Sequence, residues 1–360
     1  MTVLLLGGNG LLGHNVLKLL LEQGYAVHAL VRNPNGLRTE TFPQAQTLLT
    51  VVKGSLLDDD DLRKAAEGCD AIVNCAGTTD MSLLHYNDYL PVNSNLCHRL
   101  VQLMAQVGIT RLVHTSTANT IGYGEPNRPA TETAPMKYPF TDSYYARSKS
   151  EGEAELLQAA EAHPDWHVVV LNPGFMVGAY DTKPSSGVLL LTGYRKPLMV
   201  CPKGGKSFVH VADAATAVVH AIERGESGKR YLLTGENLTL RQFYQLQAEV
   251  CRYRQKIVVL PNWVLQVAGR AGDMLRLCGV GTQVSSRNVR LLTVCEYYDN
   301  KRAVEELGMP QTPIKQAIAD FFEWYLSNSK LKIENLNLAV VRTQKLSVQR
   351  HEKSPTYASK

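Results

Sequence analysis

The sequence predicts an α/β fold, in which a doubly wound parallel sheet is joined to a smaller, mainly helical C-terminal portion. Three observations predict it. Short apolar runs alternate with helical patterns up to about residue 178, glycines recur at every third position after the first run, and residues 239–327 read as mainly helical. With 360 residues, 44% of them apolar, the chain can form two domains or one large domain with an appendage.

The first element is a short apolar run, Thr2–Leu6, which is typical of a buried parallel strand. Glycines follow at positions 7, 10 and 13, and helical spacing of apolar residues begins at Leu12. A tight turn favours Gly7, close approach of a pyrophosphate favours Gly10, and helix-on-strand packing favours Gly13. The helix N-terminus then faces the phosphates. We interpret this stretch as a Rossmann-type dinucleotide site, with an ordinary glycine-rich turn as the alternative.

The end of the second expected strand, Ala26–Val31, bears on cofactor choice. Sites that select NAD place Asp or Glu about 20 residues past the glycines, where the carboxylate binds the ribose 2′-hydroxyl. This chain has Arg32 there and Arg38 close behind, and a guanidinium is suited to a 2′-phosphate. The pattern predicts NADP, with NAD left open and a solvated loop arginine as the alternative reading.

Further strands and helices continue the alternation. We expect strands at Leu48–Lys53, Ala71–Asn74, Arg111–Thr115, Trp166–Asn172 and Tyr231–Thr234, and helices at Asp58–Glu67 and Val92–Ala105. Ligands of doubly wound sheets bind at the carboxyl ends of the strands. The glycine loop, Asn74 and Thr117 should therefore meet at that edge.

Tyr145 and Lys149 are expected one turn apart on a helix that continues through Leu157. A phenol with a pKa near 10 is a weak acid–base catalyst at neutral pH, and a neighbouring ammonium favours the phenolate and lowers that pKa. The neighbouring pair Tyr144 and Ser148 has the same spacing but lacks the ammonium. The spacing predicts Tyr145 and Lys149 as catalytic residues.

Several motifs follow one another along the chain in an order that is shared with a known family of enzymes. They are Gly7/Gly10/Gly13, Asn93 within Pro91–Asn95, Thr115–Thr117, Tyr145/Lys149, Asn172–Gly178, Phe208–Ala214, Asp299–Ala303 and Glu306–Gly308. Over residues 1–327 the chain resembles the extended short-chain dehydrogenases/reductases of the NAD-dependent epimerase/dehydratase superfamily. Within that superfamily it is most similar to the dihydroflavonol 4-reductase and 3β-hydroxysteroid dehydrogenase-like group.

The resemblance implies site residues. It assigns Thr117 to the substrate carbonyl and gives Lys149 a second role at the nicotinamide ribose. The predicted cofactor set is Gly7, Asn9, Gly10, Leu11, Gly13, Arg32, Leu56, Ala76, Gly77, Asn93, Lys149, Pro173 and Met176. Two departures stand out: Gly54-Ser55-Leu56 replaces a common Gly-Asp-Leu, and Ile121-Gly122 replaces the usual Tyr-Gly, which recurs displaced at Tyr123-Gly124.

We expect an NADP-binding domain at 1–178, to which a strand and helix near 207–235 return. Residues 179–206 and 236–327 are expected to bind substrate, and the basic tail, 328–360, to be mostly disordered. The apolar stretch 263–277 has three interpretations: a core helix, a lid over an apolar substrate, or a membrane-surface helix. His210 is interpreted as structural.

Composition excludes several classes of protein. The seven cysteines are scattered without a C-x-x-C pair, which argues against a disulfide framework and against a zinc site; we therefore expect no metal and a cytoplasmic location. No apolar run approaches a membrane span. The formal charge of +5 equals the excess of seven Lys/Arg over two Glu in residues 330–360, so the body is neutral and nucleic acid is not an expected partner.

The predicted function is NADP(H)-dependent interconversion of a ketone or aldehyde with an alcohol, on a mostly apolar small molecule. A nucleotide-sugar epimerase or dehydratase with tightly bound NAD(P) is one alternative, and a non-catalytic NADP-sensing protein is another. Arg32 disfavours the first, and retention of Tyr145 and Lys149 disfavours the second. A homodimer is left open.

Overall fold

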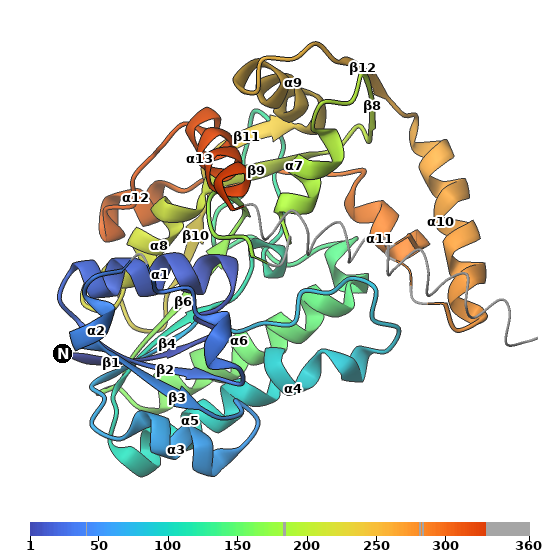
Figure 1. Cartoon of the computed structure of the whole chain (residues 1–360). Coiled ribbons are helices and arrows are strands. Elements are labelled where there is room, and N and C mark those ends of the chain that lie inside the picture. The colour runs from blue at the N-terminus through green and yellow to red at the C-terminus, as the bar shows by residue number, and fades with distance from the viewer. Residues whose placement is uncertain (41, 183–184, 281, 283, 329–360) are drawn as a thin grey trace, which may run out of the picture.

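A seven-stranded parallel sheet forms the centre of the molecule (Figure 1). The computed structural model describes residues 1–40, 42–182, 185–280, 282 and 284–328. The strand order is β10-β6-β5-β4-β1-β2-β3, so its direction reverses between β1 and β4. The strands are β1 (Thr2–Leu6), β2 (Ala26–Val31), β3 (Leu49–Lys53), β4 (Ala71–Asn74), β5 (Arg111–Thr115), β6 (His167–Pro173) and β10 (Arg230–Leu233). This confirms the predicted fold class.

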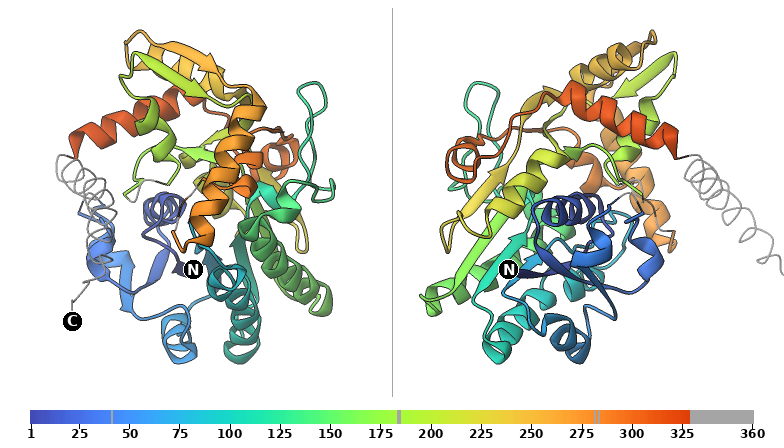
Figure 2. Two further views of the ribbon diagram at one scale, coloured as in Figure 1. Left: turned by 90° about the vertical axis from the view of Figure 1, so that its right-hand side faces the viewer. Right: turned by 60° about the vertical axis from the view of Figure 1, so that its left-hand side comes forward.

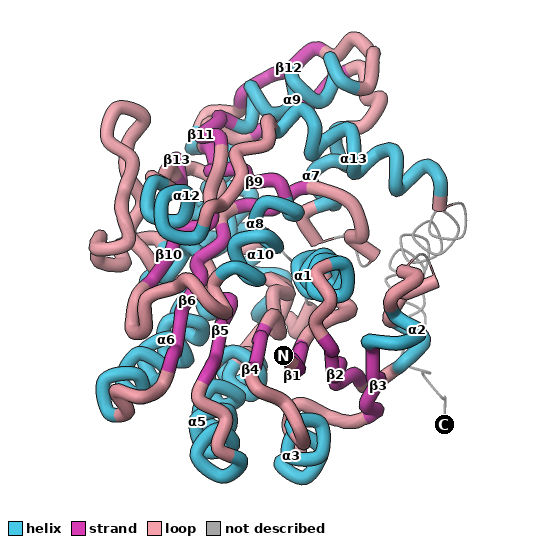
Figure 3. Tube along the Cα trace, turned by 90° about the vertical axis from the view of Figure 1, so that its left-hand side faces the viewer, coloured by secondary structure: helices cyan, strands magenta, loops and turns pink. Residues whose placement is uncertain are grey.

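Helices cover both faces of the sheet, as the edge-on view in Figure 3 shows. One face carries α1 (Leu11–Glu22), α8 (Val211–His220) and α12 (Lys301–Leu307); the other carries α3 (Asp59–Ala66), α5 (Asn95–Val107) and α6 (Tyr144–Ala162). Successive β1 residues alternate between the two cores, with Val3 and Leu5 on the α1 side and Leu4 and Leu6 on the α5 side. Burial on both faces explains why the strand is apolar throughout.

A second lobe lies beyond the carboxyl ends of the strands (Figure 1). It contains a four-stranded sheet of β7 (Phe175–Val177), β9 (Gly205–His210), β11 (Glu236–Thr239) and β13 (Cys295–Glu296), and a pair formed by β8 (Leu198–Cys201) and β12 (Lys256–Val259). Its helices are α7 (Gly187–Gly193), α9 (Leu240–Val250), α10 (Asn262–Leu277), α11 (Ser286–Leu291) and α13 (Ile314–Ser327). Its apolar core includes stacked Phe208 and Phe243.

Some helices and strands of the structure differ from those that the sequence predicts. The helix expected at Val92–Ala105 is two helices, α4 (Leu90–Asn93) and α5, because Ser94 departs from helical geometry at φ −118°. The short strands of the second lobe were missed, since they fall in irregular or seemingly helical stretches. The remaining short elements are α2 (Ala45–Leu48) and 3₁₀ turns at Pro34–Gly36, Tyr86–Asp88, Ala118–Thr120 and Phe140–Asp142.

The position of helix α10 excludes one of the three interpretations of residues 263–277. Trp263, Val267, Met274 and Leu277 are each more than half exposed, and only Gly269 and Gly272 are buried. Interpretation of this stretch as a core helix is therefore wrong; Figure 2 shows α10, in orange, on the outside of the molecule. The two glycines let it approach Val284 and Ser286 closely. Among the described residues no helix is long and apolar enough to cross a membrane, and the expected tail from residue 329 lies outside them.

The β1–α1 turn lies at the point where the strand order reverses. Gly7 has φ +79°, and a Cβ there would lie 2.7 Å from the Ala76 nitrogen at the end of β4. A Cβ on Gly13 would lie 2.1 Å from the Gly7 carbonyl oxygen. Both glycines are thus required by backbone packing. Gly10 has more room, because the nearest atom to its Cβ position is 3.4 Å away.

We predict that Gly13→Ala lowers the free energy of unfolding by about 1–3 kcal/mol, because the new methyl group forces α1 away from the turn. Gly10→Ala is the matched control and should cost less than about 1 kcal/mol, the loss of a good N-cap residue. Urea unfolding followed by circular dichroism measures both. Equal losses would contradict the packing argument.

Candidate active site

Thr117, Tyr145 and Lys149 come together at the carboxyl edge of the sheet. Helix α6 begins after Ser143, whose side chain caps it by accepting from the Ala146 amide. The Thr117 hydroxyl lies close enough to the Tyr145 hydroxyl to lower its pKa. One turn along α6, Lys149 is 2% exposed, and its ammonium donates to the carbonyl oxygens of Thr115 at 2.8 Å and Ala76 at 3.4 Å.

Burial controls the ionisation of both groups. It raises the pKa of Tyr145, and the nearby Thr117 hydroxyl opposes that rise. It lowers the pKa of Lys149, and this is opposed mainly by Cys97 and Cys75. The tyrosine is therefore held in its protonated form at neutral pH, and the expectation that Lys149 lowers its pKa is wrong, because burial has the larger effect. The Tyr145 hydroxyl can therefore donate a hydrogen bond to an oxygen atom bound beside it and Thr117.

Asn93 fixes the loop that follows β4. Its side chain accepts from the Thr78 amide at 2.8 Å and donates to the Thr78 carbonyl at 3.0 Å and to Ser148 on α6 at 3.0 Å. Gly77 lies between them: a Cβ there would be 3.5 Å from the Lys149 ammonium and 3.7 Å from the Asn93 oxygen. Asn93 thus holds the loop and α6 at a set separation, with Gly77 leaving open the space in front of Lys149.

The remaining predicted residues lie along the same edge or beside it. Ala76 is buried, and its amide donates to Asn74. Pro173 ends β6, and Met176 lies on β7, half-buried against the α1 side of the core. Leu56 follows β3 and packs against the opposite core. In the preceding Ser55, which replaces the acid of the common motif, the amide donates to the Asp61 carboxylate.

The N-terminus of α1, at the carboxyl edge of the sheet, has the features of a binding site for a dinucleotide phosphate. Gly10 caps α1 without a side-chain acceptor, and the first turn contains no acidic residue, so its amides are available to an anion. Arg32 is exposed directly after β2, and half-buried Arg38 lies nearby; neither forms an ion pair within the described residues. His14 packs against Tyr180, and burial, aided by Arg38, lowers its pKa to about 4.

Comparison with family models matches residues 3–233 to the NAD dependent epimerase/dehydratase family. The chain belongs to this family. It is 29% identical to a putative dihydroflavonol 4-reductase of Synechocystis, over 91% of this chain and 95% of that protein, and 28% identical to sterol demethylase protein B of Methylococcus capsulatus, over 90% and 98%. These relatives confirm the resemblance to the extended short-chain dehydrogenases/reductases and their dihydroflavonol reductase-like group. The enzyme is an NAD(P)-dependent oxidoreductase.

Solved structures share its fold. The crystal structure of gox2253 superimposes with a TM-score of 0.76 at 24% identity, covering 91% of this chain and 98% of that one. A UDP-glucose 4-epimerase of Thermotoga maritima gives 0.71 at 19% identity, covering 91% and 99%. The architecture described above is therefore that of the family.

Sequence reasoning missed a buried polar network behind Thr117. The Asn172 amide donates to the Thr117 carbonyl at 3.2 Å and to Glu153 at 2.9 Å. Glu153 is 1% exposed, also contacts the Thr120 hydroxyl at 2.9 Å, and pairs with Arg230 at 2.6 Å. The sequence did contain a signal for this network, because Glu153 lies two turns after Tyr145 on the inward face of α6.

We predict that Glu153→Ala lowers the free energy of unfolding by about 1.5–3 kcal/mol, because it removes the charged partner of Arg230 and an acceptor of the Asn172 amide and the Thr120 hydroxyl. Glu155→Ala is the control on the same helix: Glu155 pairs with His98 at the surface, and its loss should cost less than about 1 kcal/mol. Urea unfolding of the two variants measures both losses in the free energy of unfolding. A small effect at Glu153 would mean that water replaces the carboxylate.

Proposed function

We propose that the enzyme interconverts a ketone or aldehyde and an alcohol with NADP(H), on a mostly apolar small molecule. The observation that carries this proposal is the closeness of the Thr117 and Tyr145 hydroxyl groups at the sheet edge, with Lys149 one turn away on α6. Two hydroxyl groups that face one position form a binding site for a carbonyl oxygen.

Each residue has a role in the proposed reduction. Bound NADPH supplies a hydride to the carbonyl carbon. Tyr145, kept protonated by burial, donates its proton to the oxygen as negative charge develops there, and the Thr117 hydroxyl holds the same oxygen. The Lys149 ammonium, anchored on the Thr115 carbonyl, stabilises the phenolate that remains and binds the nicotinamide ribose. The network behind Thr117 keeps that strand end in position.

The preference for NADP(H) is supported by the charges at the end of β2. Arg32 and Arg38 face solvent without a carboxylate partner in the described chain, and a 2′-phosphate is the anion they suit. We assign the remaining predicted cofactor residues, from Asn9 and Leu11 in the glycine loop to Met176, to the same cofactor.

The domain division is proposed on the same basis. The sheet formed by residues 1–178, with β10 returning to it, would hold the cofactor, and the second lobe would bind the substrate. The reductase and sterol-processing names of the relatives support a carbonyl compound with an apolar body.

We predict that Tyr145→Phe lowers the rate of NADPH-dependent carbonyl reduction by about 10²–10⁴-fold, because it removes the proton donor and keeps the ring. Stability and NADPH affinity should change little. Tyr144→Phe is the matched control and should retain activity. The reverse pattern would show that the wrong tyrosine was chosen, and activity in both variants would exclude the mechanism.

We predict that Arg32→Ala weakens NADPH binding by about 1.5–3 kcal/mol and leaves NADH binding almost unchanged, because only NADPH carries the 2′-phosphate. Calorimetric titration with both cofactors measures this. Equal losses would contradict the assignment, whereas tight binding of UDP in the presence of NADP would favour the nucleotide-sugar alternative.

A further inference from the structure

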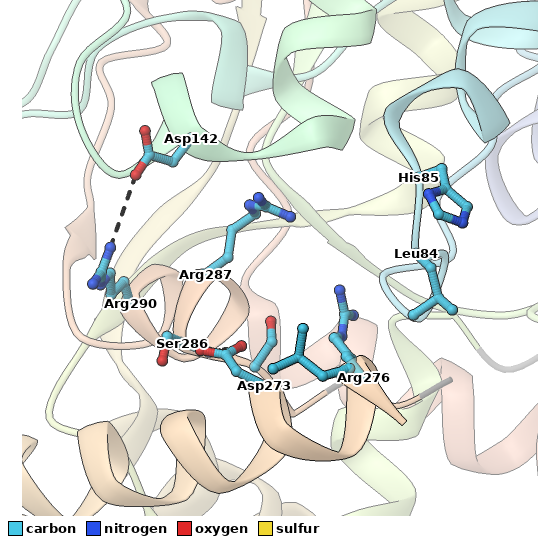
Figure 4. A pocket seen from close by; sticks show the side chains of 10 residues that line it. Leu84, His85, Asp142, Asp273, Arg276, Ser286, Arg287 and Arg290 are labelled. Atoms are coloured by element: carbon cyan, nitrogen blue, oxygen red, sulfur yellow. Dashed lines mark hydrogen bonds and ion pairs between the residues drawn. The ribbon is translucent and has the colours of Figure 1, made fainter. Parts of the chain in front are cut away.

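A pocket of about 560 Å³ lies between the start of α6 and the helices α10 and α11 (Figure 4). Its wall is formed by Leu84, His85, Asp142, Asp273, Arg276, Leu277, Ser285, Ser286, Arg287 and Arg290. The size is that of a site for one small molecule. It lies near the start of the helix that carries Tyr145, because Asp142 is in its wall and the Arg287 guanidinium lies 3.7 Å from the centre of the Tyr144 ring.

Three arginines line this pocket, and their charges are not equally balanced. Arg290 pairs with Asp142 at 3.8 Å. The other acid, Asp273, accepts from the Ser286 amide at the start of α11. Arg276 and Arg287 therefore remain without a carboxylate partner among the described residues.

Both unpaired guanidiniums are nevertheless held in position. Arg276 donates to the carbonyl oxygens of Thr282 at 2.6 Å and Met81 at 2.8 Å, which orient it without neutralising its charge. The Arg287 guanidinium lies over the Tyr144 ring at 3.7 Å from its centre, a cation–π contact that holds the side chain in place, and within the described part of the chain it has no ion pair. In Figure 4 both side chains rise from α10 and α11 into the pocket.

We propose that the substrate carries an acidic oxygen group, a carboxylate or a phosphate ester, that binds to Arg276 and Arg287. This rests on the proposed function, since the anion belongs to the carbonyl compound that the enzyme is proposed to reduce. Preorganised guanidiniums bind such groups through paired, charge-assisted hydrogen bonds. The exposed side chain of Leu277 in the pocket wall is an apolar surface on which the apolar part of the substrate would pack. The substrate class is thus an apolar carbonyl compound with one anionic end.

The test uses three aryl ketone probes of similar size: 4-acetylbenzoate, 4-acetylphenyl phosphate and the neutral methyl 4-acetylbenzoate. Each is titrated calorimetrically into the full-length protein with NADP⁺ present, a mixture in which the ketone cannot be reduced. We expect at least one anionic probe to bind about 10- to 100-fold more tightly than the neutral ester. The preferred anion distinguishes a carboxylate from a phosphate ester.

Variants connect this preference to the pocket. Arg287→Met should abolish the preference, and Arg287→Lys should retain part of it, because the charge remains but the paired geometry is lost. Arg270→Met is the matched control, since Arg270 is exposed on α10 and outside the pocket wall. Equal affinity for the ester and both anions, lack of measurable binding by both anions, or equal losses in the Arg287 and Arg270 variants would overturn the proposal. Reduction of the neutral ester is measured separately, and its failure would count against the proposed function alone.

Discussion

The packing of α6 on one face of the sheet, with its first turns near the carboxyl ends of the strands, is the constraint on which the site depends. Three inward positions spaced by four residues, Tyr145, Lys149 and Glu153, reach the ends of different strands from this helix. Lys149 bonds the backbone at the ends of β4 and β5, and Glu153 reaches Asn172 on β6 and Arg230 on β10. A shift of α6 by one residue would break all of these contacts together.

This constraint explains why so many polar groups can be buried at one edge. An unpaired ammonium or carboxylate in the interior would cost several kcal/mol, in the range of about 3–5 kcal/mol for a broken buried pair. Here the Lys149 charge is met by carbonyl oxygens that the strand ends leave free, and Glu153 is met by Asn172, Thr120 and Arg230. The same network holds the backbone at Thr117, because the Asn172 amide donates to the Thr117 carbonyl.

Arginines without a carboxylate partner among the described residues lie on the two sides of this edge. Arg32 and Arg38 lie at the α1 end, and Arg276 and Arg287 lie in the pocket beside the start of α6. The first pair is suited to a cofactor phosphate and the second to an acidic group on the substrate. The carbonyl site lies at the same edge, so a molecule that met both the hydroxyl groups and the pocket would be oriented by its anionic end.

The sequence by itself determined the elements whose patterns are local. It determined the alternating strands and helices of the main sheet, the glycine turn, and the pairing of Tyr145 with Lys149, because a four-residue spacing on one helix and a glycine between strand and helix are properties of neighbouring residues. Only the tertiary structure decided that Asn172 and Arg230 complete the environment of Glu153, that α10 lies outside the core, and that Arg287 packs on Tyr144. These contacts join residues far apart in the chain, such as Arg276 and Met81, and depend on how the second lobe is placed over the strand ends. No local period encodes that placement, since it results from packing between the lobes.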